Sequence, residues 1–175
     1  REPILSSKGD VFFTLIRSIV GQQISVYAAD AVWERIEKCV QKITPNQFLK
    51  QSKEDLRKCG LSFRKIEYIL GIAETWKMDY DSLEWDSLSD EEAKIKLTAL
   101  RGVGPWTAEM ILIFTLMRPD VFSIGDIGLI RAVQKLVPEA ESKQDVLEIA
   151  QRWAPYRTAA SWYLWRMLDP VPVEY

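Results

Sequence analysis

Apolar positions recur at helical spacing along almost the whole chain. Val11, Leu15 and Ile19 fall on one side of a 3.6-residue repeat, as do Ile66 and Ile69 further along. The same reading predicts helices over residues 25–42, 53–59, 62–77, 89–100, 105–116, 126–136, 142–152 and 155–168. No stretch alternates with a period of two for long enough to indicate a strand. The pattern therefore predicts an all-α fold of about nine or ten helices.

Polar residues and glycines mark several of the expected helix ends. Thr44 followed by Pro45 is typical of an N-cap with proline in the first turn. Ser89 and Glu92 have the spacing of a capping box. Gly60 is placed to end a short helix in the left-handed conformation. These signals support the boundaries given by the hydrophobic pattern.

Composition excludes several classes of chemistry. The 175 residues contain no histidine, which rules out Ser-His-Asp triads, imidazole general bases and zinc sites built on histidine. Two cysteines cannot form a four-cysteine iron–sulfur or zinc site, or a dense disulfide framework. The longest apolar run, residues 110–117, is too short to cross a membrane, and the 175 residues show no signal-peptide pattern. We therefore expect an intracellular protein without membrane association.

The charge balance is slightly acidic. Twenty-three basic and 25 acidic residues give a net charge of −2, which taken alone argues weakly against a nucleic-acid partner. The acidity is concentrated between Asp79 and Glu92, a segment that we interpret as a solvated linker and helix start. The rest of the chain is mildly positive, so the global charge is a poor guide to binding.

The most informative stretch runs from Leu97 to Ala108. A helix ends near Leu100, a tight Gly102-Val103-Gly104 turn follows, and a new helix begins at Pro105. Glycines suit a sharp turn that brings the backbone close to another group, and the unpaired N–H groups of the next helix can bind a phosphate. An ordinary αα-hairpin closed by glycines has the same pattern, so both interpretations stay open on this stretch alone.

Three other segments accompany this hairpin. Residues 121–131 hold Asp126, which lies 22 residues after Gly104; residues 15–26 contain Gly-Gln-Gln; residues 153–165 are rich in aromatic side chains. In this order the four segments resemble DNA repair glycosylases in which a helix-hairpin-helix is followed by a Gly/Pro-rich loop and an aspartate, the HhH-GPD superfamily. The last segment resembles the 3-methyladenine DNA glycosylase II (AlkA-like) branch. The resemblance covers about residues 11–166.

Single residues indicate which branch of the superfamily the chain resembles. Bifunctional relatives carry a lysine two places after the second hairpin glycine, and Trp106 stands there in this chain. Because an indole cannot form an imine, no lyase step is expected at this position. The two cysteines exclude the iron–sulfur cluster found in some relatives. The helical chain also lacks the N-terminal β domain of the long AlkA form, so it resembles a compact form.

The resemblance implies two helical lobes with an active-site cleft between them. We place the boundary at the proline-marked loop Arg118-Pro119-Asp120. The first lobe would be residues 11–118, with the helix-hairpin-helix at about 89–117. The second would be residues 1–10 plus 119–175 and would carry the aspartate loop.

The resemblance also assigns roles to single residues. Asp126 would be the catalytic carboxylate; an N-cap of the helix over 126–136 is the alternative interpretation, and the two roles are compatible, with catalysis favoured by the surrounding loop. Asp120 is its nearest competitor, but following Pro119 it fits a turn better. Gln23, or its neighbour Gln22, would fill the gap that a flipped nucleotide leaves.

The remaining assignments concern the base pocket and the DNA backbone. Trp106 and Trp165 would line the base pocket, with Trp162 or Tyr163 assisting. The phosphate-binding hairpin would comprise Gly102, Val103, Gly104 and Thr107, and the carbonyls of Thr98, Leu100 and Val103 would hold a structural Na⁺ or K⁺. For most of the seven tryptophans, plain core packing is the better interpretation.

The function that follows is hydrolysis of the N-glycosidic bond of an alkylated purine flipped out of double-stranded DNA, by a monomer that needs no cofactor for the chemistry. The candidate bases are 3-methyladenine, 7-methylguanine, 1-methyladenine and hypoxanthine. Three alternatives remain: a mismatch thymine or uracil glycosylase of the same fold, a non-catalytic helix-hairpin-helix DNA-binding module, and an all-α scaffold whose hairpin binds nothing.

Overall fold

The computed structural model describes residues 10–168, and in this range the fold is entirely helical. The α-helices are α1 (Val11–Gly21), α2 (Val26–Val40), α3 (Pro45–Phe48), α4 (Lys53–Lys58), α5 (Phe63–Thr75), α6 (Asp90–Thr98), α7 (Pro105–Phe114), α8 (Ile127–Leu136), α9 (Lys143–Gln151) and α10 (Arg157–Leu168). A π-helical turn, Trp76–Tyr80, and a 3₁₀ turn, Trp85–Ser87, connect α5 to α6. The predicted all-α fold is confirmed.

Helix ends follow the sequence signals closely. Ser89 accepts from the Glu92 N–H while the Glu92 carboxylate accepts from the Ser89 N–H, which completes the predicted capping box. Gly60 has a φ of 101°, as its position after α4 requires. Thr44 occupies the N-cap of α3 and Pro45 follows it, but the Thr44 side chain makes no capping hydrogen bond.

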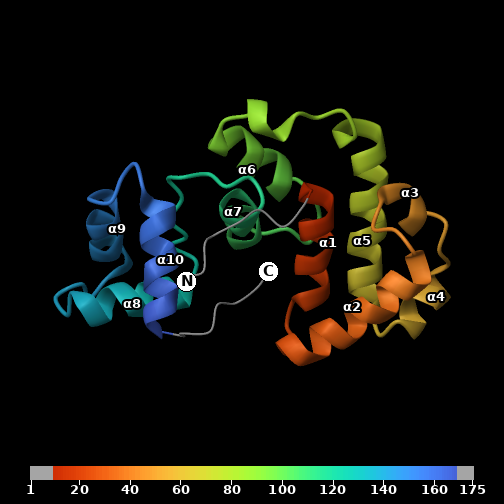
Figure 1. Ribbon diagram of the computed structural model, residues 1–175, viewed down its shortest axis with the longest axis horizontal. Coiled ribbons are helices and arrows are strands. Elements are labelled where there is room, and N and C mark those ends of the chain that lie inside the picture. The colour runs from red at the N-terminus through yellow and green to blue at the C-terminus, as the bar shows by residue number, and fades with distance from the viewer. Residues whose placement is uncertain (1–9, 169–175) are drawn as a thin grey trace, which may run out of the picture.

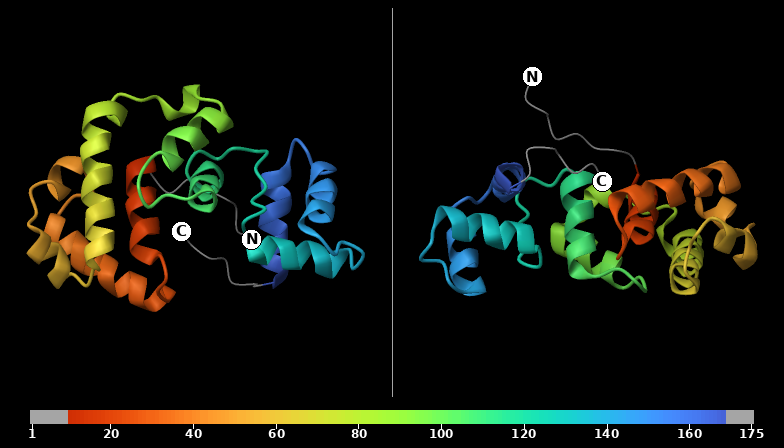
Figure 2. Two further views of the ribbon diagram at one scale, coloured as in Figure 1. Left: turned by 180° about the vertical axis from the view of Figure 1, so that it is seen from behind. Right: turned by 90° about the horizontal axis from the view of Figure 1, so that it is seen from below.

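The buried side chains form two clusters. The larger one contains buried residues from Val11 to Val121, and the smaller one contains Leu129, Ala132, Val133, Ala140, Val146 and Leu164. Figure 1 shows α8, α9 and α10 grouped at one end of the molecule and α2 to α5 at the other, with α7 between them. Figure 2 shows the same separation from behind and from below.

The details of this division differ from the boundaries expected from sequence. Asp10 caps α1 with its side chain, so this residue belongs with the first group of helices and not with the second. Val121 is likewise buried in the larger cluster, three residues beyond Arg118. Residues 1–9 and 169–175 of the expected second lobe lie outside the described residues.

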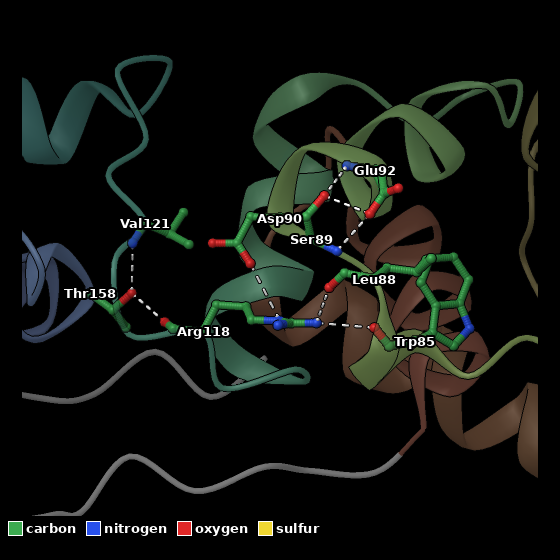
Figure 3. A network of polar contacts seen from close by, with 8 residues as sticks. All are labelled: Trp85, Leu88, Ser89, Asp90, Glu92, Arg118, Val121 and Thr158. Carbon is green, nitrogen blue, oxygen red and sulfur yellow. Dashed lines mark hydrogen bonds and ion pairs between the residues drawn. The ribbon is translucent and has the colours of Figure 1, made fainter.

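The loop between α7 and α8 is fastened at its start by Arg118 (Figure 3). The Arg118 guanidinium donates to the carbonyls of Trp85 and Leu88 at 3.0 and 2.8 Å and pairs with Asp90 at 3.4 Å. On α10, the Thr158 hydroxyl donates to the Arg118 carbonyl. One arginine therefore ties the acidic segment before α6 to the beginning of the loop that leads to Asp126.

The hairpin between α6 and α7 packs tightly against α5. Gly102 has a φ of 96°, and a Cβ added there would lie 2.4 Å from the ring of Tyr68. Gly104 differs, because an added Cβ would meet nothing within 4 Å. The first glycine is required by both its backbone conformation and its packing, whereas the second is not required by packing.

This contrast predicts different stabilities for two alanine variants. Gly102→Ala should destabilise the fold by about 1–3 kcal/mol, because an L-residue is strained at this φ and the Tyr68 ring must move. Gly104→Ala is the matched control and should change the free energy of unfolding by less than about 1 kcal/mol. Chemical denaturation of both variants measures the difference; equal stabilities would contradict this interpretation.

Candidate functional site

Asp126 lies at the end of the long loop, at the point where the second group of helices begins. It is the N-cap of α8, and its Oδ1 accepts the N–H of Leu129 at 2.9 Å. The Asp126 N–H donates in turn to the carbonyl of Ser123 at 3.1 Å. The capping role predicted for this aspartate is confirmed, and it fixes the carboxylate at the helix N-terminus, where negative charge is favoured.

Two indole N–H groups converge on the same carboxylate. Nε1 of Trp106, on α7, donates to Asp126 Oδ2 at 2.9 Å, and Nε1 of Trp165, on α10, donates to Oδ1 at 3.3 Å. The Trp165 ring also stacks on Phe114 with centroids 5.6 Å apart. Gly128 leaves room for this arrangement, since a Cβ there would lie 3.0 Å from Asp126 Oδ1. The structure therefore brings Asp126 together with Trp106, 20 positions before it, and with Trp165, 39 positions after it.

The other aromatic candidates lie further from the carboxylate. Trp162 packs edge-on against Phe114, with ring centroids 6.4 Å apart. Tyr163 is 62% exposed on α10. Of the two residues expected to assist, Trp162 therefore supports the wall behind Trp165, and Tyr163 faces solvent.

Asp120, the competing carboxylate, is held by an arginine. Arg157 donates to both of its carboxylate oxygens, from Nε at 2.7 Å and from Nη2 at 2.9 Å, and its main-chain N–H donates at 3.2 Å. This bidentate pair holds the pKa of Asp120 below its ordinary value. Asp120 therefore fastens the loop to the start of α10.

A cavity of about 400 Å³ adjoins Trp106. Its other walls come from the end of α1 and the start of α2, and they comprise Thr14, Arg17, Ser18, Val20, Gly21, Gln22, Gln23, Val26, Ala29 and Asp30. Arg17 and Asp30 form an ion pair at 2.8 Å, and the Arg17 guanidinium lies over the Trp33 ring at 5.2 Å. Sequence reasoning missed Arg17 and Asp30, because a 13-residue separation across two helices leaves no local signal.

The Gly21-Gln22-Gln23 turn is held from two sides. Lys65 donates to the carbonyl of Val20 at 2.6 Å, and the Gln22 side-chain amide donates to the carbonyl of Gly102 in the hairpin at 3.0 Å. Burial lowers the pKa of Lys65. Gln23 is exposed and has a φ of 60°, which is uncommon for a non-glycine residue. Gln22 therefore faces the hairpin, and Gln23 is the residue that projects from the turn.

The hairpin presents main chain rather than side chains. Gly104 is the N-cap of α7 and supplies no capping side chain, and Pro105 follows it. Val103 is buried in the larger cluster, as the sequence indicated. Thr107 is only 5% exposed, so this member of the expected phosphate-binding set is buried and its hydroxyl is not presented at the surface.

Sequence and structure comparisons identify the family of this helical, aspartate-bearing fold. Residues 16–155 match the model of the HhH-GPD superfamily of base excision DNA repair proteins, and the chain belongs to this family. The chain is 36% identical to DNA-3-methyladenine glycosylase 1 of Schizosaccharomyces pombe, over 91% of this chain and 73% of that protein. A putative DNA-3-methyladenine glycosylase of Bacillus subtilis is 31% identical, and this chain spans 59% of its length.

Two solved structures share the whole arrangement. A DNA-3-methyladenine glycosidase from Bacillus halodurans superposes with a TM-score of 0.87 at 38% identity, covering 95% of this chain and 79% of that one. The S. pombe 3-methyladenine DNA glycosylase Mag1 in complex with abasic DNA gives a TM-score of 0.81 at 33% identity, covering 99% and 88%. Within residues 10–168, no helix is long and apolar enough to cross a membrane. The predicted family and branch are confirmed.

The Asp120–Arg157 pair predicts a pH dependence of stability. Because the folded-state pKa of Asp120 is depressed, the pair stabilises the fold above the ordinary value of 3.8 and this contribution is lost as the pH falls through the folded pKa. Asp120→Asn should lower the melting temperature at about pH 6, and the gap to wild type should narrow as the pH falls below 3.8. A gap that stays constant down to about pH 2 would show that the pair does not act through charge.

Proposed function

We propose that this chain is a monofunctional DNA glycosylase that hydrolyses the N-glycosidic bond of alkylated purines in damaged double-stranded DNA. The observation that carries the proposal is the Asp126 carboxylate, which is held by one main-chain and two indole N–H groups at the junction of the two helical groups. The names of the similar proteins point to the same class of reaction. The proposal further takes the enzyme to act as a monomer inside the cell.

Asp126 would act mainly by electrostatics. Cleavage of the glycosidic bond develops positive charge on the sugar, and a fixed carboxylate beside C1′ stabilises that charge. Three N–H donors keep the carboxylate oriented before the substrate arrives, so little reorganisation is needed during the reaction. The same carboxylate can orient the water that attacks C1′.

Trp106 would link the chemistry to base recognition. Its indole N–H reaches Asp126, and the residue also forms one wall of the 400 Å³ cavity. A base held against this indole therefore places its glycosidic bond close to the carboxylate. An alkylated purine such as 3-methyladenine carries positive charge, and the aromatic face of Trp106 favours such a base by cation–π attraction of about 1–2 kcal/mol. Trp165, expected in the same pocket, does not line this cavity and instead stacks on Phe114 and donates to Asp126.

The leaving group explains why no strong general acid is needed. A base that is already cationic departs as a neutral molecule, so protonation is not required for cleavage. The chain contains no histidine, and the groups that touch Asp126 are indoles and a main-chain amide. This site suits alkylated purines better than thymine or uracil, whose departure as anions is harder.

The hairpin and the Gly21–Gln23 turn would hold the DNA. Main-chain N–H groups at the start of α7 bind a phosphate, helped by the helix dipole. Gln23 enters the stack where the damaged nucleotide has left it. The Gln22–Gly102 hydrogen bond joins these two elements, so the phosphate contact and the wedge keep a fixed spacing.

A monovalent cation at the hairpin is compatible with its carbonyl groups. The Leu100 carbonyl accepts the Val103 N–H at 3.1 Å. Among the turn and cap hydrogen bonds of residues 10–168, none ends on the carbonyls of Thr98 or Val103. These three oxygens would hold Na⁺ or K⁺, and the ion would supply positive charge for a DNA phosphate. Asp126 and the two indoles would perform the chemistry without a cofactor.

The first test removes the carboxylate charge. Asp126→Asn should lower the single-turnover rate of 3-methyladenine release by about 100-fold or more, because the amide cannot stabilise the cationic sugar. Chromatography of the bases released from a methylated duplex measures the rate. Equal rates for the variant and wild type would exclude Asp126 as the catalytic residue.

The same reaction tests the absence of lyase activity. Wild type should produce abasic sites without nicking the strand, since Trp106 cannot form an imine. A borohydride-trapped covalent complex would contradict the monofunctional assignment. A panel of 3-methyladenine, 7-methylguanine, 1-methyladenine, hypoxanthine and uracil tests the substrate class, and preferential release of uracil would contradict it.

Variants at Gln23 and Gln22 distinguish the wedge's effect on the reaction rate from the turn's effect on stability. Gln23→Ala should lower the single-turnover rate about tenfold, since unstacking of a few kcal/mol is no longer offset, while the melting temperature stays unchanged. Gln22→Ala should destabilise the fold by about 1 kcal/mol through the lost bond to Gly102. The wedge assignment fails if Gln23→Ala retains the wild-type rate.

A further inference from the structure

A buried carboxylate in α7 has no role in the function proposed so far. Glu109 has a side chain 10% exposed, on a helix whose residues from Thr107 to Phe114 are all buried. Replacing a buried ion pair with well-packed apolar residues is often neutral or stabilising, so packing alone does not call for a glutamate at this position. Its contacts indicate what it does.

The two carboxylate oxygens of Glu109 reach two different elements. Oε1 accepts a hydrogen bond from Nζ of Lys94, on α6, at 2.6 Å. Oε2 accepts the hydroxyl of Ser123 at 2.6 Å, and Ser123 is fully buried in the loop that leads to Asp126. Both bonds are short, and the ion pair offsets the cost of burying the charge.

The main chain of Ser123 connects the Glu109 anchor to Asp126. Its carbonyl accepts the Asp126 N–H at 3.1 Å and so closes the turn that presents the carboxylate. Trp106, which donates to Asp126, lies one helical turn before Glu109 on α7. The same helix therefore holds the Asp126 side chain through Trp106 and the Asp126 backbone through Glu109 and Ser123.

We propose that Glu109 is a positioning residue for Asp126, acting through the Ser123 hydroxyl, and that its hydrogen bond from Lys94 fixes this anchorage to the helix that leads into the DNA-binding hairpin. The inference rests on the proposed function, because it assumes that Asp126 is catalytic. Without the anchor, the turn would shift the carboxylate relative to the Trp106 indole. A displacement of about 1 Å is enough to slow a reaction severely.

Ser123→Ala tests the anchor with the smallest change. The single-turnover rate of 3-methyladenine release should fall about tenfold or more, while the Kd for a duplex with an abasic site stays within about twofold of wild type. Ser161→Ala is the matched control: Ser161 is also a fully buried serine, and its hydroxyl donates to the Arg157 carbonyl of α10 at 2.9 Å and contacts the Val121 carbonyl of the same loop at 3.4 Å. Its rate should stay within about twofold of wild type, because Val121 lies outside the turn.

Two substitutions at Glu109 test whether its hydrogen bonds or its negative charge matter for the reaction. Glu109→Gln should retain at least about a third of the rate, because its carbonyl can accept from Lys94 while its amide donates to the Ser123 hydroxyl. Glu109→Ala should be as slow as Ser123→Ala. If the glutamine variant is as slow as the alanine variant, the charge matters rather than the anchor, and the proposal fails.

The remaining outcomes distinguish this inference from the function on which it rests. An inactive Asp126→Asn enzyme combined with an unaffected Ser123→Ala enzyme would overturn the positioning role and leave the proposed function intact. Equal losses in Ser123→Ala and Ser161→Ala would show general loosening of the loop and would also overturn it. A fully active Asp126→Asn enzyme would remove the proposed function itself.

Discussion

The arrangement of this site depends on the hydrogen bonds to one carboxylate. Asp126 accepts from the Leu129 main chain and from the indoles of Trp106 and Trp165, so α8, α7 and α10 all meet at its two oxygens. Without these donors the Asp126 carboxylate would have no fixed orientation, and it would be hydrogen-bonded to water instead of to the protein. The three donors therefore define both the position of the charge and the relative placement of the helices that supply them.

Helix α7 is the element on which these constraints converge. Its first turn follows the glycine hairpin, its second residue is Trp106, and Glu109 one turn later binds the buried Ser123. The start of α7 therefore faces the proposed phosphate contact, while the same turns fix the catalytic loop. Close packing of Gly102 against Tyr68 and the Gln22–Gly102 bond extend this rigid unit to α5 and α1.

Much of this arrangement could be predicted from sequence because its signals are local. Helical periodicity, the Ser89–Glu92 capping box and the Asp126 cap each depend on neighbouring residues, and all three are present. The family resemblance assigned Trp106, Trp165 and Asp126 to one active site, but the indole hydrogen bonds to the carboxylate were not predicted, since Trp165 lies 39 residues from Asp126. Arg17–Asp30 in the cavity wall and Glu109–Ser123 beneath the loop were missed, because long-range polar pairs leave no periodic pattern.

The most direct test of the central claim is a crystal structure of the Asp126→Asn variant bound to a duplex that carries an uncleaved alkylated purine. We expect the damaged nucleotide outside the stack, its base against the Trp106 indole and its C1′ within about 4 Å of the side chain at position 126. A damaged base that stays stacked in the duplex, or a C1′ that lies instead beside Asp120, would contradict it.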